Sequence, residues 1–162
     1  MSLYGSNEYK KAGIKEEPVI LEKVIKFLKS QKFSVTAKQS TLLEDIHKKF
    51  DYCLIFDKSK LFSGRDKIYV DVKYARTFTL YDNNGYNTLE NSKSDYIIFN
   101  DPKNNSKLTW INTKRLIECL KINKPILYKS REENNTSEYF WIEDYIRKNK
   151  TWFEKNSKSV NI

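Results

Sequence analysis

Two short segments of the chain are strongly β-forming: residues 50–56 (FDYCLIF) and 67–73 (KIYVDVK). β-Branched and aromatic residues dominate both segments, and the second alternates apolar with polar residues. The run Ser63-Gly64-Arg65-Asp66 between them is typical of a turn. The two segments therefore predict a long antiparallel hairpin. Because an isolated hairpin is only marginally stable in water, further strands or helices must cover it.

The rest of the chain supplies such elements. Leu21, Val24 and Leu28 follow helical spacing after Glu16-Glu17-Pro18, which suits a helix start, so we expect a helix over residues 16–31. Other segments are expected as strands at 33–37, 77–81, 96–99 and 125–128, a loop at 100–107, and helices at 113–122 and 137–149. This order predicts an α/β or α+β domain in which helices flank a central mixed sheet.

Length and composition are those of one domain. Of the 162 residues, 39% are hydrophobic, which is enough to bury a core. We expect a flexible N-terminus over residues 1–15, a single domain over 16–150 and a flexible C-terminal tail over 151–162. No apolar run approaches the roughly 18 residues that a membrane helix needs, so we expect no membrane contact and a cytoplasmic location. Cys53 and Cys119 form no CxxC pair, which excludes a zinc finger or a disulfide framework.

The charge of the chain is strongly positive. Lys and Arg total 30 against 21 Asp and Glu, which gives a formal net charge of +9. A basic surface attracts polyanions through phosphate contacts and counterion release, so the charge favours a nucleic-acid partner. The alternative is compositional bias, because Lys, Asn and Ile are abundant together, as in AT-rich coding sequence. The lone Gly64 and Gly85 form no phosphate-binding glycine loop.

Charged residues mark one end of the predicted hairpin. Asp51 begins the first strand, and Asp71-Val72-Lys73 ends the second. Asp71 and Lys73 share a face, because strand side chains alternate. Antiparallel pairing places the start of one strand beside the end of its partner. We therefore expect Asp51 to meet Asp71 and Lys73 in space.

This set of side chains predicts a metal site. Two neighbouring carboxylates repel one another unless a cation joins them. Carboxylate oxygens are preferred ligands of Mg²⁺, which also accepts a phosphate oxygen. We predict Mg²⁺ (or Mn²⁺) bound by Asp51 and Asp71, with Lys73 beside the reacting phosphate. The spacing D/E-x-K alone is not specific, since Glu8-Tyr9-Lys10 and Asp101-Pro102-Lys103 share it. The strand context of Asp71-Val72-Lys73 carries the prediction.

On these residues the chain resembles the PD-(D/E)xK nuclease superfamily, which has the restriction-endonuclease-like fold. The resemblance covers roughly residues 16–128 and implies a core of a helix, a three-strand meander, a helix and a further strand. It matches the first acid to Asp51, and the second acid and the lysine to Asp71 and Lys73. Phe50 stands where the signature has proline, and Asp71 stands where glutamate is commoner.

The resemblance implies further residues and partners. Many members place a glutamate on the first helix, for which Glu22 is the candidate and Glu17 the alternative. Asp45 resembles an acid that several phage and resolvase-like members carry just before the metal-binding strand. Such relatives make a phage or mobile-element origin and a homodimer reasonable expectations.

The resemblance and the basic charge together predict a metal-dependent DNA endonuclease that hydrolyses phosphodiester bonds. Asp51 and Asp71 would hold the metal, Lys73 would assist the attacking water, and Glu22 would complete the catalytic set. Basic residues near the site are candidates for contact with DNA phosphates: Lys48, Lys49 and Arg76.

Two other classes of function stay open from the sequence. One is an inactive domain of the same fold that binds nucleic acid or protein. The other is an unrelated α+β interaction protein whose positive charge is compositional. DNA and RNA are not distinguished, nor are linear and branched substrates.

Overall fold

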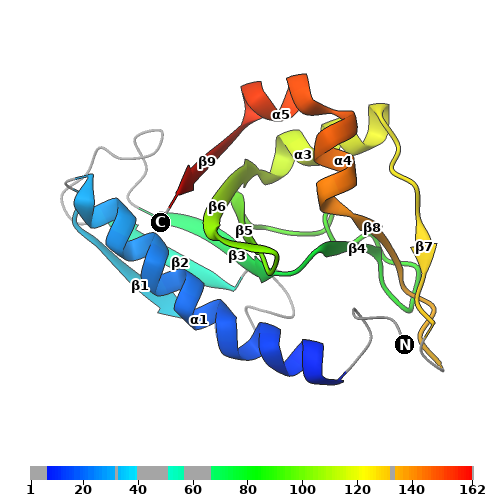
Figure 1. The fold of residues 1–162 in the computed structure, drawn as a ribbon, viewed down its shortest axis with the longest axis horizontal. Coiled ribbons are helices and arrows are strands. Elements are labelled where there is room, and N and C mark those ends of the chain that lie inside the picture. The colour runs from blue at the N-terminus through cyan, green and yellow to red at the C-terminus, as the bar shows by residue number, and fades with distance from the viewer. Residues whose placement is uncertain (1–6, 32, 40–50, 57–66, 132–133, 162) are drawn as a thin grey trace.

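The computed structural model describes residues 7–31, 33–39, 51–56, 67–131 and 134–161. These residues form a six-stranded mixed sheet, a small second sheet and helices on both sides (Figure 1). In chain order the elements are α1 (Asn7–Ser30), β1 (Val35–Gln39), β2 (Tyr52–Phe56), β3 (Lys67–Tyr74), β4 (Thr77–Tyr81), β5 (Tyr96–Asp101), β6 (Asn104–Asn112), α3 (Thr113–Ile122), β7 (Tyr128–Lys129), β8 (Glu138–Trp141), α4 (Ile142–Lys148), α5 (Lys150–Asn156) and β9 (Ser157–Asn161).

The large sheet has the strand order β1-β2-β3-β5-β6-β9. β1, β2 and β3 form an antiparallel meander, and β5 lies parallel to β3. β6 and β9 continue the sheet in antiparallel pairs. β4, β8 and β7 form the small sheet. The predicted fold class is confirmed at the level of an α+β domain with a central mixed sheet flanked by helices.

The predicted hairpin is present. Tyr52 pairs with Val70 and Leu54 with Ile68 in the antiparallel register of β2 and β3. The helix predicted at residues 113–122 is confirmed as α3. Its N-cap is Asn112, whose side-chain oxygen accepts from the backbone N–H of Arg115 at 3.0 Å.

Both ends of the domain differ from the prediction. α1 begins at Asn7 rather than near Glu16, so residues 7–15 belong to the helix, and Pro18 lies inside it. The tail predicted over 151–162 instead contributes the end of α5 and the edge strand β9, which pairs with β6. Phe153 is 4% exposed, and its burial in the core holds α5 against the rest of the domain.

Three interior predictions were also wrong. The segment 137–149 is a strand followed by a helix, because Phe140 of β8 pairs with Phe78 of β4 and their ring centroids lie 5.9 Å apart. Most of the loop predicted at 100–107 belongs to β6 or to its turn with β5. Only Tyr128 of the strand predicted at 125–128 is in β7.

Two apolar cores cover the two faces of the large sheet. The first lies under α1 and includes Val24 and Leu28 of the helix with Val70 and Val72 of β3. The second, on the opposite face, joins Ile97 and Ile111 of the sheet to the small sheet, α3, α4 and α5. No helix among the described residues is long and apolar enough to cross a membrane.

Candidate functional site

The side chains of β3 divide between the two faces of the sheet. Val70 and Val72 pack in the first core, beneath α1. Asp71 and Lys73 therefore project to the opposite face, where the second core lies. Both are half-buried. The predicted sharing of one face by Asp71 and Lys73 follows from this geometry.

Asp51 meets β3 beside the same two residues. Its backbone N–H donates to the carbonyl oxygen of Val70 at 3.1 Å. Its carboxylate Oδ2 accepts from the backbone N–H of Val72 at 2.9 Å. Val72 is the residue between Asp71 and Lys73, so the three predicted residues converge on one short stretch of β3. A charge-assisted bond of this kind also fixes the orientation of the Asp51 carboxylate.

The Asp71 carboxylate is held by a chain of hydroxyl groups. Ser92 Oγ donates to Asp71 Oδ2 at 3.0 Å. Ser92 Oγ also lies 2.8 Å from Ser94 Oγ, which lies 3.1 Å from Thr113 Oγ1. Thr113 is the first residue of α3. The chain of hydroxyls thus connects the carboxylate to the start of that helix.

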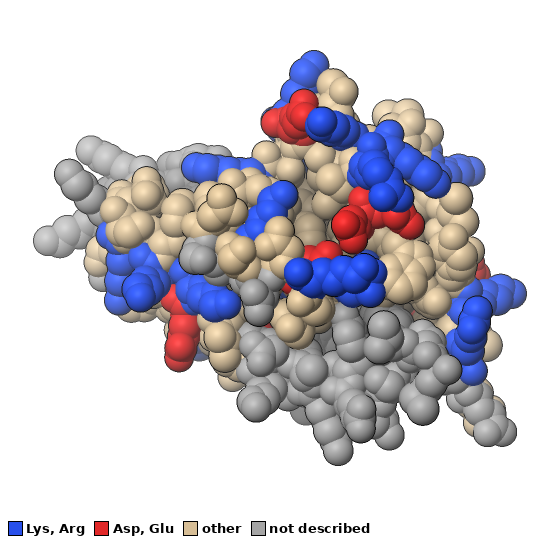
Figure 2. All heavy atoms as spheres, in the orientation of Figure 1, with Lys and Arg blue, Asp and Glu red and all other residues tan. Residues whose placement is uncertain are grey.

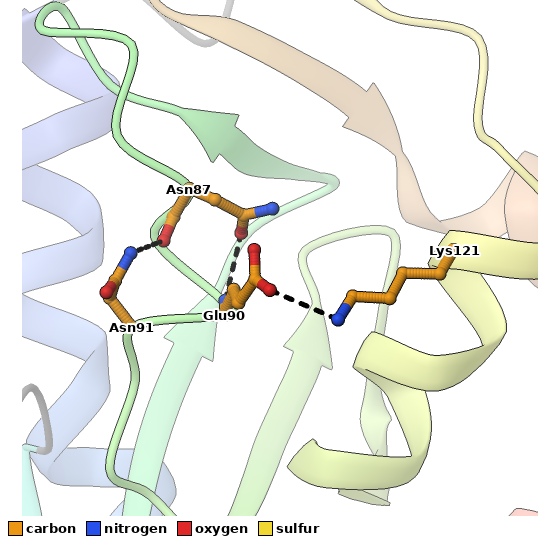
Figure 3. A network of polar contacts seen from close by, with 4 residues as sticks. All are labelled: Asn87, Glu90, Asn91 and Lys121. Atoms are coloured by element: carbon orange, nitrogen blue, oxygen red, sulfur yellow. Dashed lines mark hydrogen bonds and ion pairs between the residues drawn. The ribbon is translucent and has the colours of Figure 1, made fainter.

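The loop that carries Ser92 is fastened to α3 by a second set of contacts (Figure 3). Asn87 Oδ1 accepts from the backbone N–H of Glu90 at 2.9 Å, and Asn91 Nδ2 donates to the carbonyl oxygen of Asn87 at 2.8 Å. The Glu90 carboxylate lies 3.1 Å from Lys121 Nζ on α3. These contacts turn the chain just before Ser92, and the ion pair links this turn to α3.

Burial raises the pKa of Asp71 above its usual range. The positive charge of Lys73, the hydroxyls of Ser92 and Ser94, and the backbone of Asp51 lower it in part. The Asp71 carboxyl group therefore lies in a poorly solvated environment, in which these partners favour its ionised form. A site of this kind gains from a bound cation, because the cation replaces the missing solvation.

Lys73 lies between the carboxylate and the second core. Its Nζ is 5.7 Å from the centroid of the Phe78 ring, and Asp71 is its Coulombic partner. The aliphatic stem can pack on apolar neighbours while the ammonium group stays beside the carboxylate.

Glu17 rather than Glu22 lies on the buried side of α1. Glu22 is exposed, and it lies on the side of α1 opposite the buried Ile20 and Val24. Glu17 is half-buried and lies in line with the buried stripe, seven residues before Val24. Burial raises the pKa of Tyr52, and the charges of Glu17 and Asp51 raise it further. The charges of Glu17 and Asp51 therefore both reach the hydroxyl group of Tyr52.

The predicted phosphate contacts have different outcomes. Lys48 and Lys49 lie outside the described residues, as does Asp45. Arg76 is half-buried, and its guanidinium carbon lies 5.2 Å from the centroid of the Trp141 ring. Its Nε is buried and has no hydrogen-bond partner among the described residues. Arg76 is thus packed against the small sheet, and its contact with phosphate stays a prediction.

Sequence reasoning missed Ser92 and Ser94. The available signal was the polar run Ser92-Lys93-Ser94-Asp95 directly before the buried strand β5. Only the parallel pairing of β5 with β3 brings that run beside Asp71.

The donor set fits a hard divalent cation. Asp51 and Asp71 offer carboxylate oxygens, and Mg²⁺ commonly takes one or two carboxylates and keeps several waters. In the part of the chain that the structure describes, no group of three or more His, Cys, Asp or Glu side chains forms a potential metal site. Binding of a metal ion by Asp51 and Asp71 stays a prediction.

The contact between Ser92 and Asp71 predicts a loss of metal affinity when the hydroxyl is removed. A Ser92→Ala variant should need about tenfold or more Mg²⁺ for the same thermal stabilisation, because outer-shell partners orient metal ligands. Ser92→Thr, which keeps the hydroxyl, should restore most of the affinity. Ser106→Ala is a matched control, since its exposed hydroxyl bonds to the Asn104 side chain within β6. Equal Mg²⁺ dependence in Ser92→Ala and wild type would contradict the role.

No protein-family model, curated protein or solved structure matches the chain. The resemblance to the PD-(D/E)xK nucleases therefore stays a prediction.

Proposed function

We propose that the protein is a metal-dependent nuclease that hydrolyses phosphodiester bonds in DNA. The observation that carries the proposal is the bond from the Val72 N–H to the Asp51 carboxylate, because it joins the first acid to the residue between Asp71 and Lys73.

The order of elements also supports the proposal. α1, the meander β1-β2-β3 and the parallel strand β5 follow the core expected of a restriction-endonuclease-like domain. The chain places β4 and a turn-rich segment between β3 and β5, where that core has a helix. We propose a restriction-endonuclease-like fold in which β4 and the turn-rich segment replace the helix between β3 and β5.

Each residue would have a distinct role. Asp51 and Asp71 would hold Mg²⁺ or Mn²⁺, and Ser92 would orient Asp71. Lys73 would orient the attacking water and stabilise negative charge that develops on the phosphate. Glu17 would add negative charge at the end of the site near Tyr52. When bound, the metal would polarise the phosphodiester and favour deprotonation of the nucleophile.

The test is cleavage of plasmid, single-stranded and four-way-junction DNA with Mg²⁺ or Mn²⁺, beside an EDTA control. Asp51→Asn should lower the cleavage rate more than about 100-fold, because loss of a few kcal/mol of charge stabilisation has that effect. Asp144→Asn is the matched control, since Asp144 is an exposed acid on α4 that pairs with Arg147. Cleavage that survives EDTA or Asp51→Asn would refute the proposal. Binding without cleavage would instead support an inactive binding domain.

A further inference from the structure

Two cavities meet at one end of the large sheet. We call the first the hydroxyl pocket; it has a volume of about 430 Å³ and is lined in part by Ser92, Lys93, Ser94, Asn112, Thr113 and Lys114. We call the second the end groove; it has a volume of about 560 Å³ and is lined in part by Phe27, Tyr96, Trp110, Arg115, Lys155 and Lys158.

The two cavities share Tyr96 and Asn112 in their walls. These residues are partners in the register of β5 and β6, where the two strands begin and end. The hydroxyl pocket and the end groove together therefore form a path around this end of the sheet. At its inner end it contains Ser92, which donates to the Asp71 carboxylate. The hydroxyl pocket thus adjoins the proposed catalytic site.

Positive charge follows the path. Lys93 and Lys114 line the hydroxyl pocket, and Arg115, Lys155 and Lys158 line the end groove; all five are exposed. Arg115 Nη1 donates to Asn156 Oδ1 at 3.1 Å, so a neutral amide holds the guanidinium in place without cancelling its charge.

The acids along the path have other partners. None of the described residues that line the end groove is acidic. In the hydroxyl pocket, Glu90 pairs with Lys121, and Asp95 Oδ2 accepts from the backbone N–H of Tyr69 at 2.9 Å. Among the charged side chains drawn in Figure 2, Lys and Arg cover more of the visible face than Asp and Glu do. The excess of positive charge along the path matches a chain of phosphates.

The shape of the path favours an unpaired strand. Cavities of about 300–1,000 Å³ have the size of pockets for small organic ligands, and a nucleotide is such a ligand. Phe27 and Tyr96 are partly exposed in the end groove, and aromatic side chains beside a basic groove are the usual means of holding unpaired bases. A duplex keeps its bases stacked inside, so it could not place one in this groove.

We propose that the hydroxyl pocket and the end groove form one binding path for an unpaired nucleic-acid strand that leads away from the site at Asp71. The path would contact phosphates through its lysines and Arg115, and bases through Phe27 and Tyr96. The proposal rests on the proposed function for its choice of a polyanionic substrate, but it concerns binding rather than cleavage.

The test measures binding of a fluorescent oligothymidylate by anisotropy, with EDTA present so that no cleavage occurs. The triple variant Arg115→Gln, Lys155→Gln, Lys158→Gln should bind at least about tenfold more weakly. Its plot of log K against log salt should be shallower by about 2, because each phosphate contact to a single strand contributes about 0.7. The control is the triple variant Lys103→Gln, Lys129→Gln, Lys148→Gln, which removes the same charge from exposed positions elsewhere.

Three results would overturn the path: equal weakening in both triple variants, unchanged binding by the groove variant, or tighter wild-type binding to the matched duplex. The outcome is separable from that of the proposed function. Strand binding that depends on the groove, in a protein that cleaves nothing, would support the path and refute the nuclease. Metal-dependent cleavage by wild type, with unchanged strand binding by the groove variant, would support the nuclease and refute the path.

Discussion

An Asp71→Asn variant should lose cleavage activity and gain stability. The cleavage rate should fall more than about 100-fold, because the variant lacks a metal ligand and the Coulombic partner of Lys73. Without metal, the variant should unfold at a higher temperature than wild type at pH 7, because the amide keeps an oxygen for Ser92 but carries no buried charge. A gain of 1 kcal/mol corresponds to about 2–4 °C for a chain of this size.

The pH dependence of this gain follows from the sign of the pKa shift. Burial raises the pKa of Asp71 in the folded protein, so the folded state binds the proton more tightly than the unfolded state does. Ionisation of Asp71 therefore lowers the free energy of unfolding as the pH rises from about 4 through the raised value. The gain in Asp71→Asn should be full above that range and absent below about pH 4.

Thermal unfolding with EDTA and then with Mg²⁺ checks both parts of this prediction. Mg²⁺ should stabilise wild type and leave Asp71→Asn unchanged, since only a state that binds the metal gains from it. Asp144→Asn should behave as wild type throughout, because Asp144 is exposed. A variant that still cleaves at a rate close to wild type, or that melts at a lower temperature without metal, would contradict our assignment of Asp71.

Replacing either of two neighbouring isoleucines in β5 should strongly destabilise the fold. Ile97 and Ile98 are both 0% exposed, and they point to opposite faces of the sheet. Ile98→Ala opens a cavity in the core under α1, and Ile97→Ala opens one in the core under α3 to α5. Each change should reduce the free energy of unfolding by about 2–5 kcal/mol.

Thermal or urea unfolding measures these losses, which correspond to about 5–15 °C in melting temperature. Ile126→Ala makes the same chemical change at a position that is 58% exposed, and it should cost less than about 0.5 kcal/mol. If only one of the two β5 variants were destabilised, the sheet would be buried on one face only, and the two-core arrangement would be wrong.

The hairpin of β2 and β3 could be predicted because its information is local. Alternation and β-branching in residues 67–73 set which side chains share a face, and antiparallel pairing sets which strand ends meet. The convergence of Asp51 with Asp71 and Lys73 followed from these two rules. α3 was predictable for the same reason, since its apolar spacing and its Asn112 cap lie within one short segment.

Two of the errors arose where pairing partners are distant in the chain. Residues 138–141 precede a helical pattern, yet they form β8 because β4 offers them a partner strand. Residues 157–161 are mostly polar, and they form β9 because β6 leaves an open edge. Neither partner can be identified from the segment itself, since the gain of pairing depends on the assembled sheet.

The site shows the same division. The sequence by itself determined the pair of acids, the lysine and the strands that carry them. Side chains alternate along a strand, so the spacing of residues decides which of them share a face. The tertiary structure alone decided that Glu17 rather than Glu22 lies near Tyr52, and that Ser92 holds Asp71. The choice of glutamate depends on which face of α1 packs on the sheet. The serine contact depends on the parallel pairing of β3 with β5, which joins residues 21 positions apart. Both are consequences of burying apolar area between whole elements, a quantity that no single segment contains.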